Sequence, residues 1–130
     1  MRPAKLEIMK GCVFRQSNPA VVGVDILAGK LKVGTPILKK GSPKTITVVK
    51  SMQHEKETVN EADAPKQLAV SLPNVMVGRQ IKEGDILYSA IPEKDFVKIK
   101  GLKEYLKPEE IEVLKEIAEI MREGNPVWGV

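Results

Sequence analysis

The first 90 residues alternate between apolar and polar positions in short runs that turn residues separate. This period of two is typical of β-strands with one buried face. The runs predict strands over residues 5–14, 21–27, 33–38, 45–49 (continuing toward Met52), 67–72, 75–77 and 86–90, whereas residues 53–66 are polar and weakly patterned. Short strands at this spacing favour a β-sandwich or a small closed barrel.

From Pro92 the apolar period changes to that of an amphipathic helix. Pro92 suits a first helical position, and Gly101 either weakens the helix or marks a break in it. The predicted apolar stripe comprises Phe96, Val97, Ile99, Leu102, Tyr105 and Leu106.

A second helix has clearer limits. Pro108 predicts its start, and Gly124 followed by Pro126 predicts its end. The two helical stripes can pack on each other, pack on the strands or leave a groove. The only tryptophan, Trp128, follows in the tail, and docking onto the helices is favoured over binding to a partner. One face of this helix carries Ile111, Leu114, Ile117, Ala118 and Met121.

A length of 130 residues fits one domain, or a small domain with an appendage. The single cysteine, Cys12, excludes an internal disulfide and a cysteine-rich zinc site, and its apolar neighbours favour a buried small hydrophobe over a reactive thiol. No apolar run approaches the roughly 20 residues of a membrane span, and no signal core follows the basic N-terminus. We therefore expect a cytoplasmic protein that does not bind membranes.

The charge is distributed unevenly along the chain. Residues 1–56 hold 11 Lys/Arg and 3 Asp/Glu, whereas residues 57–130 hold 10 and 14. This asymmetry favours a polyanion as partner of the first half. The alternative is a solvated lysine-rich surface of the kind found in proteins from hot environments.

Chemistry that would support catalysis is not evident. The only histidine, His54, cannot build a histidine-based metal cluster. Residues 41–45 superficially resemble a phosphate loop, but Pro43 stands where that loop requires glycine and has no N–H to offer. Aromatic residues are scarce, with only Phe14 before residue 88, so recognition of a nucleic-acid backbone through Lys/Arg is favoured over base stacking. The alternative is that the basic and polar residues in the predicted loops are ordinary loop residues that bind no ligand.

Five segments in order resemble the C-terminal domain, domain four, of archaeal and eukaryotic translation initiation factor 5B, the counterpart of bacterial initiation factor two. They are residues 2–5 running into 12–24 (CVFRQSNPAVVGV), 51–57 (SMQHEKE), 78–81 (GRQI), 84–89 (GDILYS) and 125–129 (NPVWG). The resemblance covers nearly the whole chain. One departure is Pro65, where relatives usually have glycine, so the turn before the strand at Gln67 is expected to differ.

The resemblance implies a mainly β fold with an α appendage: a closed β-barrel like domain two of translational GTPases over residues 1–91, and two helices over 92–130 packed on it. It implies a non-catalytic, monomeric module that binds the aminoacylated acceptor end of initiator methionyl-tRNA and promotes ribosomal subunit joining. The chain would be a fragment that needs no cofactor, because GTP and Mg²⁺ belong to the GTPase domain of the whole factor. The helices would dock the tail of initiation factor 1A.

Candidate site residues come from side chains able to form directional hydrogen bonds and from the resemblance, and the alternative for each is an ordinary core or surface residue. The tRNA-binding set is Arg15, Gln16, Asn18, Gln53, His54, Lys56 and Gln67. The resemblance implies that Gln53, His54 and Lys56 lie near the tRNA end. The methionyl pocket would use Val24, Met52, Leu68 and Ala69, although the barrel core is the favoured place for the apolar residues Val24, Met52 and Leu68. A rival hypothesis is a protein-interaction module, in which a helical groove binds a peptide through Leu114, Ile117, Met121 and Trp128.

Overall fold

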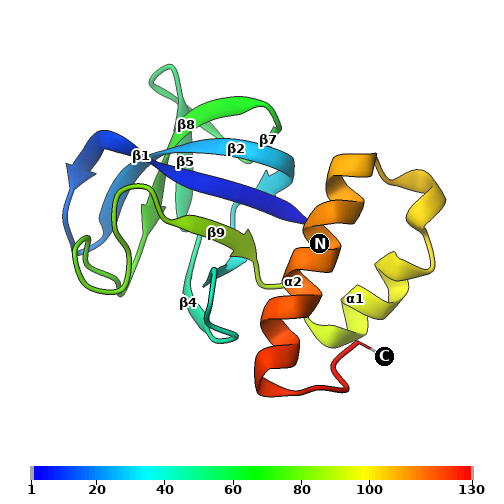
Figure 1. Ribbon diagram of the computed structural model, residues 1–130. Coiled ribbons are helices and arrows are strands. Elements are labelled where there is room, and N and C mark those ends of the chain that lie inside the picture. The colour runs from blue at the N-terminus through cyan, green and yellow to red at the C-terminus, as the bar shows by residue number, and fades with distance from the viewer. Residues whose placement is uncertain (1, 130) are drawn as a thin grey trace.

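A computed structural model describes residues 2–129, with the strands grouped before the helices (Figure 1). In that range the strands are β1 (Ala4–Arg15), β2 (Ala20–Lys32), β3 (Pro36–Lys39), β4 (Thr45–Val48), β5 (Ser51–His54), β6 (Glu57–Val59), β7 (Glu61–Asp63), β8 (Lys66–Leu72) and β9 (Ile86–Ser89). They are followed by helix α1 (Glu93–Lys100), a 3₁₀ turn (Lys103–Tyr105) and helix α2 (Pro108–Gly124).

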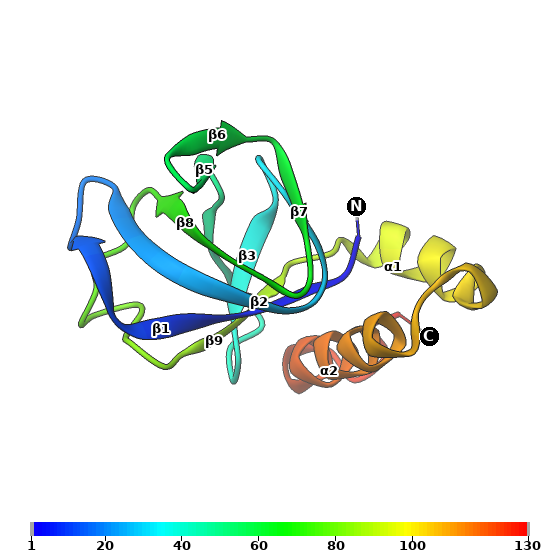
Figure 2. The same ribbon diagram turned by 90° about the horizontal axis from the view of Figure 1, so that it is seen from above.

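The strands form one strongly curled antiparallel sheet, as the view from above shows (Figure 2). Its order is β4-β3-β9-β1-β2-β8-β5-β6, and β7 pairs with the far end of β2. The long strands β1 and β2 hold the centre of this order, so they connect the two halves of the curl.

The expected closed barrel is not confirmed, because the sheet is an open half-barrel whose outer strands, β4 and β6, do not pair with each other. The chain instead changes partner between β4 and β5. Val49 donates its N–H to the Thr35 carbonyl (2.9 Å), and Lys50 donates to the Ser71 carbonyl (2.9 Å). Two adjacent residues thus link the two ends of the sheet where a closed barrel would have a full ladder.

The inner face of the curl holds the main core. Leu6, Ile8, Val22, Val24 and Ile26 are completely buried there, which follows from the alternation of apolar residues along β1 and β2. Burial of such side chains removes apolar surface from water at about 25 cal/mol per Å², the main favourable term in folding.

Three sequence expectations about strands were wrong. The run over residues 45–49, expected to continue toward Met52, is divided into β4 and β5, which pair with different strands. Residues 57–63 form β6 and β7, although they were expected to have weak structure, because three-residue strands with mostly exposed polar side chains carry no apolar period. Residues 75–77 form no strand, and only Val77 makes an isolated bridge, to Ile81.

The helical limits agree closely with those predicted. Helix α2 begins at Pro108 and runs through Gly124, with Asn125 as its C-cap. Helix α1 ends before Gly101, so this glycine marks a break, and the chain continues as a 3₁₀ turn. The expected stripe of the first helix is consequently interrupted: Phe96 is buried, whereas Leu102 and Tyr105 are exposed.

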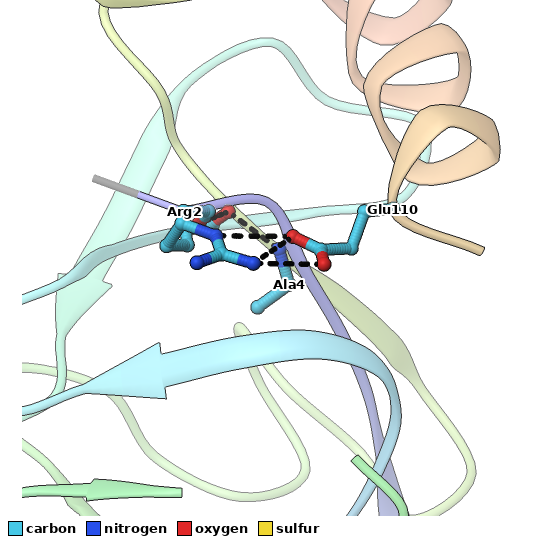
Figure 3. Close-up of polar contacts among 4 residues, drawn as sticks. Arg2, Ala4 and Glu110 are labelled. Atoms are coloured by element: carbon cyan, nitrogen blue, oxygen red, sulfur yellow. Dashed lines mark hydrogen bonds and ion pairs between the residues drawn. The ribbon is translucent and has the colours of Figure 1, made fainter. Parts of the chain in front are cut away.

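A bidentate ion pair joins the N-terminal strand to α2. The Arg2 guanidinium donates to both carboxylate oxygens of Glu110, with N···O distances of 2.7–3.1 Å. The two side chains face each other between the start of the chain and α2 (Figure 3). The Glu110 side chain is 3% exposed and that of Arg2 is 43% exposed. Loss of Arg2 would leave a buried carboxylate unpaired, so this contact orients α2 against the sheet. The Ser89 hydroxyl continues the network, since it accepts from Ala4 N–H and donates to the Arg2 carbonyl.

A second core cluster fills the space between sheet and helices. Leu38 and Tyr88 from the sheet pack there with Leu114 and Ile117 from α2. Burial, followed by the nearby Glu116 carboxylate, raises the pKa of Tyr88 to about 12, so the phenol stays neutral throughout the physiological range. Lys5 pairs with Glu116 (3.0 Å) above the same ring.

Candidate functional site

An apolar hollow of about 510 Å³ opens on the outer face of the sheet. It lies where β1, β2, β5 and β8 meet, on the side opposite the main core. A volume of this order is typical of small-ligand sites. Its lining residues are Met9, Phe14, Val21, Gly23, Gln53, Glu55, Lys56, Gln67, Leu68 and Ala69.

The floor of the hollow depends on small side chains in neighbouring strands. Gly23 pairs with Ala69, which in turn pairs with Gln53. The register of β1 shifts between Ile8 and Val13, and the resulting irregular segment folds over Gly23. A Cβ atom at Gly23 would lie 2.7 Å from Cys12 Cβ, so only glycine lets the two strands approach this closely.

A two-residue turn, Glu55–Lys56, forms one rim of the hollow between β5 and β6. Both residues have positive φ, 52° and 68°, as a type I′ hairpin turn requires. Such turns favour Asn-Gly, and each non-glycine residue in this conformation costs on the order of 1 kcal/mol. His54 precedes the turn, and its Nδ1 lies 3.1 Å from the Gln67 carbonyl oxygen. Because a carbonyl oxygen can only accept a hydrogen bond, Nδ1 is the donor.

The structure brings together five of the residues singled out from the sequence. Gln53, Lys56, Gln67, Leu68 and Ala69 all line the hollow. His54 and Gln67 also line a neighbouring open depression of about 690 Å³ with Asp25, Glu55, Pro65 and Lys66.

Three other residues of the predicted tRNA-binding set lie outside the hollow, at the end of β1 and in the connection from β1 to β2. Arg15 donates through Nε to the Ser17 carbonyl (2.9 Å). Gln16 donates through Nε2 to the Val77 carbonyl (3.1 Å), which ties it to the segment after β8. Asn18 is exposed with a φ of 61°. Arg15, Gln16 and Asn18 therefore do not line the hollow, although Phe14, the residue before Arg15, does.

Three residues of the predicted methionyl pocket belong to the main core. Val24 and Met52 are completely buried there and do not line the hollow. Leu68 borders the hollow but is buried in the same core, and it pairs with Val24. The neighbours Gly23, Gln53 and Ala69 line the hollow instead, because successive side chains in a strand point to opposite faces. The structure supports the core interpretation for Val24, Met52 and Leu68.

The sequence interpretation missed Phe14 as a site residue. Its side chain is 66% exposed and lines the hollow. An exposed ring beside an apolar hollow can stack on a nucleobase. Its position as the only aromatic residue before residue 88 was a usable signal. Met9 and Val21, which also line the hollow, carry no comparable signal in the sequence.

A second, smaller hollow of about 270 Å³ lies between α1 and α2. Its apolar lining is Phe96, Ile111, Leu114 and Ala118, and its charged lining is Lys100, Lys103, Lys115, Glu119 and Arg122. Cations thus outnumber the single carboxylate around an apolar floor. We call this the helical groove.

Most of the predicted partner-binding residues are core residues. Leu114, Ile117 and Trp128 are buried, and Met121 is half-buried. Only Leu114 lines the helical groove. The Trp128 ring packs on Phe96 with centroids 4.6 Å apart, which is the docking onto the helices that the sequence favoured.

Hydrogen bonds hold the C-terminal tail in place across the helices. Arg122 Nε donates to the Trp128 carbonyl (2.8 Å), and the Gly129 N–H donates to the Glu93 carboxylate (2.8 Å). These contacts come from both helices, so the tail closes the second core cluster and is not an extended arm.

Ion pairs neutralise some of the basic residues in the first half of the chain. Lys30 and Lys32 contact Glu61, and Lys39 contacts Asp85. Within residues 2–129, Lys10, Lys44, Lys50 and Lys56 make no ion pair. Lys56 combines this free charge with a position on the rim of the hollow.

Residues 2–129 contain no group of three or more His, Cys, Asp or Glu residues able to hold a metal ion. In the same range, neither helix has the length and hydropathy that crossing a bilayer requires.

Comparisons with known proteins decide the family. The family model of elongation factor Tu domain 4 matches residues 2–88. The chain belongs to the elongation factor Tu domain 4 family and corresponds to domain four of the IF-2/5B translation initiation factors.

The chain is similar to archaeal translation initiation factors. The chain is 39% identical to the probable translation initiation factor IF-2 of Methanopyrus kandleri and 42% identical to that of Hyperthermus butylicus, over its full length in both cases. It spans only 22% and 21% of those proteins. The crystal structure of GDP-bound aIF5B from Aeropyrum pernix matches 99% of the chain and 22% of its own length, with 34% identity and a TM-score of 0.92. The elongation factor Tu domain 4 match stops before the helices, whereas the aIF5B match includes them.

Proposed function

We propose that this domain binds the methionylated acceptor end of initiator tRNA and thereby helps a translation initiation factor promote ribosomal subunit joining. The observation that carries the proposal is the hollow on the outer face of the sheet. Its apolar floor suits a methionyl side chain, and its rim offers the amides of Gln53 and Gln67 and the ammonium of Lys56. The domain acts without a cofactor of its own, as a monomer in the cytoplasm.

The rim also suits the nucleotide that carries the methionyl ester. Lys56 supplies a cation for the phosphate backbone, and the exposed Phe14 ring supplies a stacking surface for the terminal base. Arg15, Gln16 and Asn18 lie next along the chain, so they serve the tRNA farther from the ester.

Replacement of Lys56 by alanine tests the electrostatic part of this proposal. We expect Lys56→Ala to weaken binding of methionylated initiator tRNA by about threefold to tenfold and to reduce the slope of log K against log salt by about one. The measurement is a fluorescence or filter-binding titration at several salt concentrations.

Lys44→Ala is the matched control, because Lys44 is an exposed lysine of the β3–β4 connection that lines none of the hollows described above. Equal effects of the two substitutions would show a diffuse basic surface in place of a site at the hollow.

A second candidate function is supported by the charge of the helical groove. An apolar floor surrounded by Lys100, Lys103, Lys115 and Arg122 suits an acidic peptide with apolar anchors. We propose that the tail of initiation factor 1A is such a peptide. This function would coexist with tRNA binding, because the groove and the hollow use separate residues.

Charge reversal in the groove tests this second function. We expect Lys103→Glu to weaken binding of an acidic, apolar peptide by about fivefold or more and to leave tRNA binding within a factor of about two. Lys94→Glu is the control, because Lys94 is exposed on α1 and does not line the groove. A titration of labelled peptide against both variants gives the answer, and equal losses would contradict a specific groove.

A further inference from the structure

The turn Glu55–Lys56 places two opposite charges side by side on the rim of the hollow. Lys56 is explained by the phosphates of an RNA partner, whereas Glu55 is not, because a carboxylate repels phosphate. Glu55 is the only acidic residue among the residues that line this hollow in the described part of the chain. Among the residues that line the hollow, this carboxylate is therefore the group suited to a cationic part of a ligand.

The backbone of the turn supports a role for both side chains. Glu55 and Lys56 occupy the left-handed region, where glycine or asparagine is favoured. Non-glycine residues in such conformations cluster at functional sites, where the surrounding structure holds them in place. The pairing of β5 with β6 also fixes the position of the turn, because His54 and Glu57, the residues on either side of it, pair with each other.

A methionyl ester bears one cation near the acceptor end, its free α-ammonium group. An α-amino group titrates near neutral pH, and a carboxylate beside it favours its charged form. We propose that Glu55 binds this ammonium group, so that the hollow selects an unblocked methionyl ester over one whose amine is acylated. This inference rests on the proposed function and adds to it the group that sets specificity.

Alternative partners of Glu55 within the structure are weak. Its carboxylate lies 3.8 Å from His54 Nε2, which is outside hydrogen-bonding distance, and its side chain is 85% exposed. The carboxylate is therefore free to reorient toward a ligand in the hollow. Gln53 and Gln67 offer neutral acceptors nearby that assist the same contact.

The test crosses one substitution with one chemical modification of the ligand. Affinities of the protein and of Glu55→Gln are measured for initiator tRNA carrying methionine, N-acetylmethionine or no amino acid. We expect the unmodified protein to prefer methionyl over N-acetylmethionyl tRNA by about threefold to tenfold. Glu55→Gln should remove this preference. Because it also removes a charge that repels phosphate, it should raise the affinities for the N-acetylated and deacylated forms by similar factors.

Glu57→Gln is the matched control, because Glu57 is an exposed neighbour on β6 that does not line the hollow. It should keep the preference. A preference of the same size in Glu55→Gln, alongside selective binding of methionyl over deacylated tRNA, would overturn the role of Glu55 alone. Equal binding of all three tRNA forms by the unmodified protein would overturn the proposed function and this inference together.

Discussion

Replacement of Ala69 by phenylalanine should weaken binding of methionylated initiator tRNA by about tenfold to a hundredfold. Ala69 is half-buried on β8 and lines the hollow, so a larger side chain there occupies the space proposed for the methionyl group. Burial of a methionine side chain contributes about 1.5–3 kcal/mol, which corresponds to affinity changes of this size. Binding of deacylated tRNA should change little, since the phosphate contacts remain.

Thr45→Phe is the control for this experiment. Thr45 is an exposed strand residue on β4, at the opposite end of the sheet order from the hollow. Both variants add an aromatic ring to a strand that tolerates it, so thermal denaturation should show similar stabilities. If Ala69→Phe binds methionylated tRNA as tightly as Thr45→Phe does, the methionyl group lies elsewhere.

Replacement of Ile117 by alanine should lower the free energy of unfolding by about 2–5 kcal/mol. Ile117 is completely buried in the second core cluster, where it packs with residues of both sheet and helices. Urea denaturation, followed by circular dichroism and by Trp128 fluorescence, measures the effect. Because Leu38 and Tyr88 of the sheet share this cluster, both probes should report one coincident transition.

Glu123→Ala is the control, because Glu123 is exposed near the end of α2 and should change stability by less than about 0.5 kcal/mol. A Trp128 transition at a lower urea concentration than the transition of the sheet would show that the helices unfold separately. The barrel and helical appendage predicted from the sequence, residues 1–91 and 92–130, would then be two separate folding units.

Local signals predicted the second helix well. Pro108 supplies a fixed φ and no unsatisfied N–H at the first turn, and Pro126 prevents continuation, so the limits of α2 depend on residues inside or next to it. Its buried face was only partly predicted. Val113 and Ile120 are buried although the predicted stripe omitted them, because α2 contacts both the sheet and the tail.

Long-range pairing is the part that sequence patterns could not supply. β6 and β7 exist because β5 and the far end of β2 offer edges to pair with, and no periodicity in residues 57–63 records this. The opening of the half-barrel likewise depends on long-range bonds, because Val49 donates to Thr35 whereas the next residue, Lys50, donates to Ser71.

The sequence named residues that lie near one another, but not the directions in which they point. Gln53, Gln67 and Ala69 line one hollow, and their role in binding stays a prediction. A strict period of two would have shown that Val24 cannot share a face with Gly23. The place of Gln16 could not have been inferred, because it is set by a bond to Val77, 61 residues away.

The most direct test of the central claim compares methionylated with deacylated initiator tRNA, using the affinity of each and the rate at which the methionyl ester hydrolyses. If the hollow holds the methionyl group, the methionylated form binds more tightly and the protein slows hydrolysis of its ester. Equal, salt-sensitive affinities with no protection of the ester would contradict the account and leave only a basic surface on the sheet.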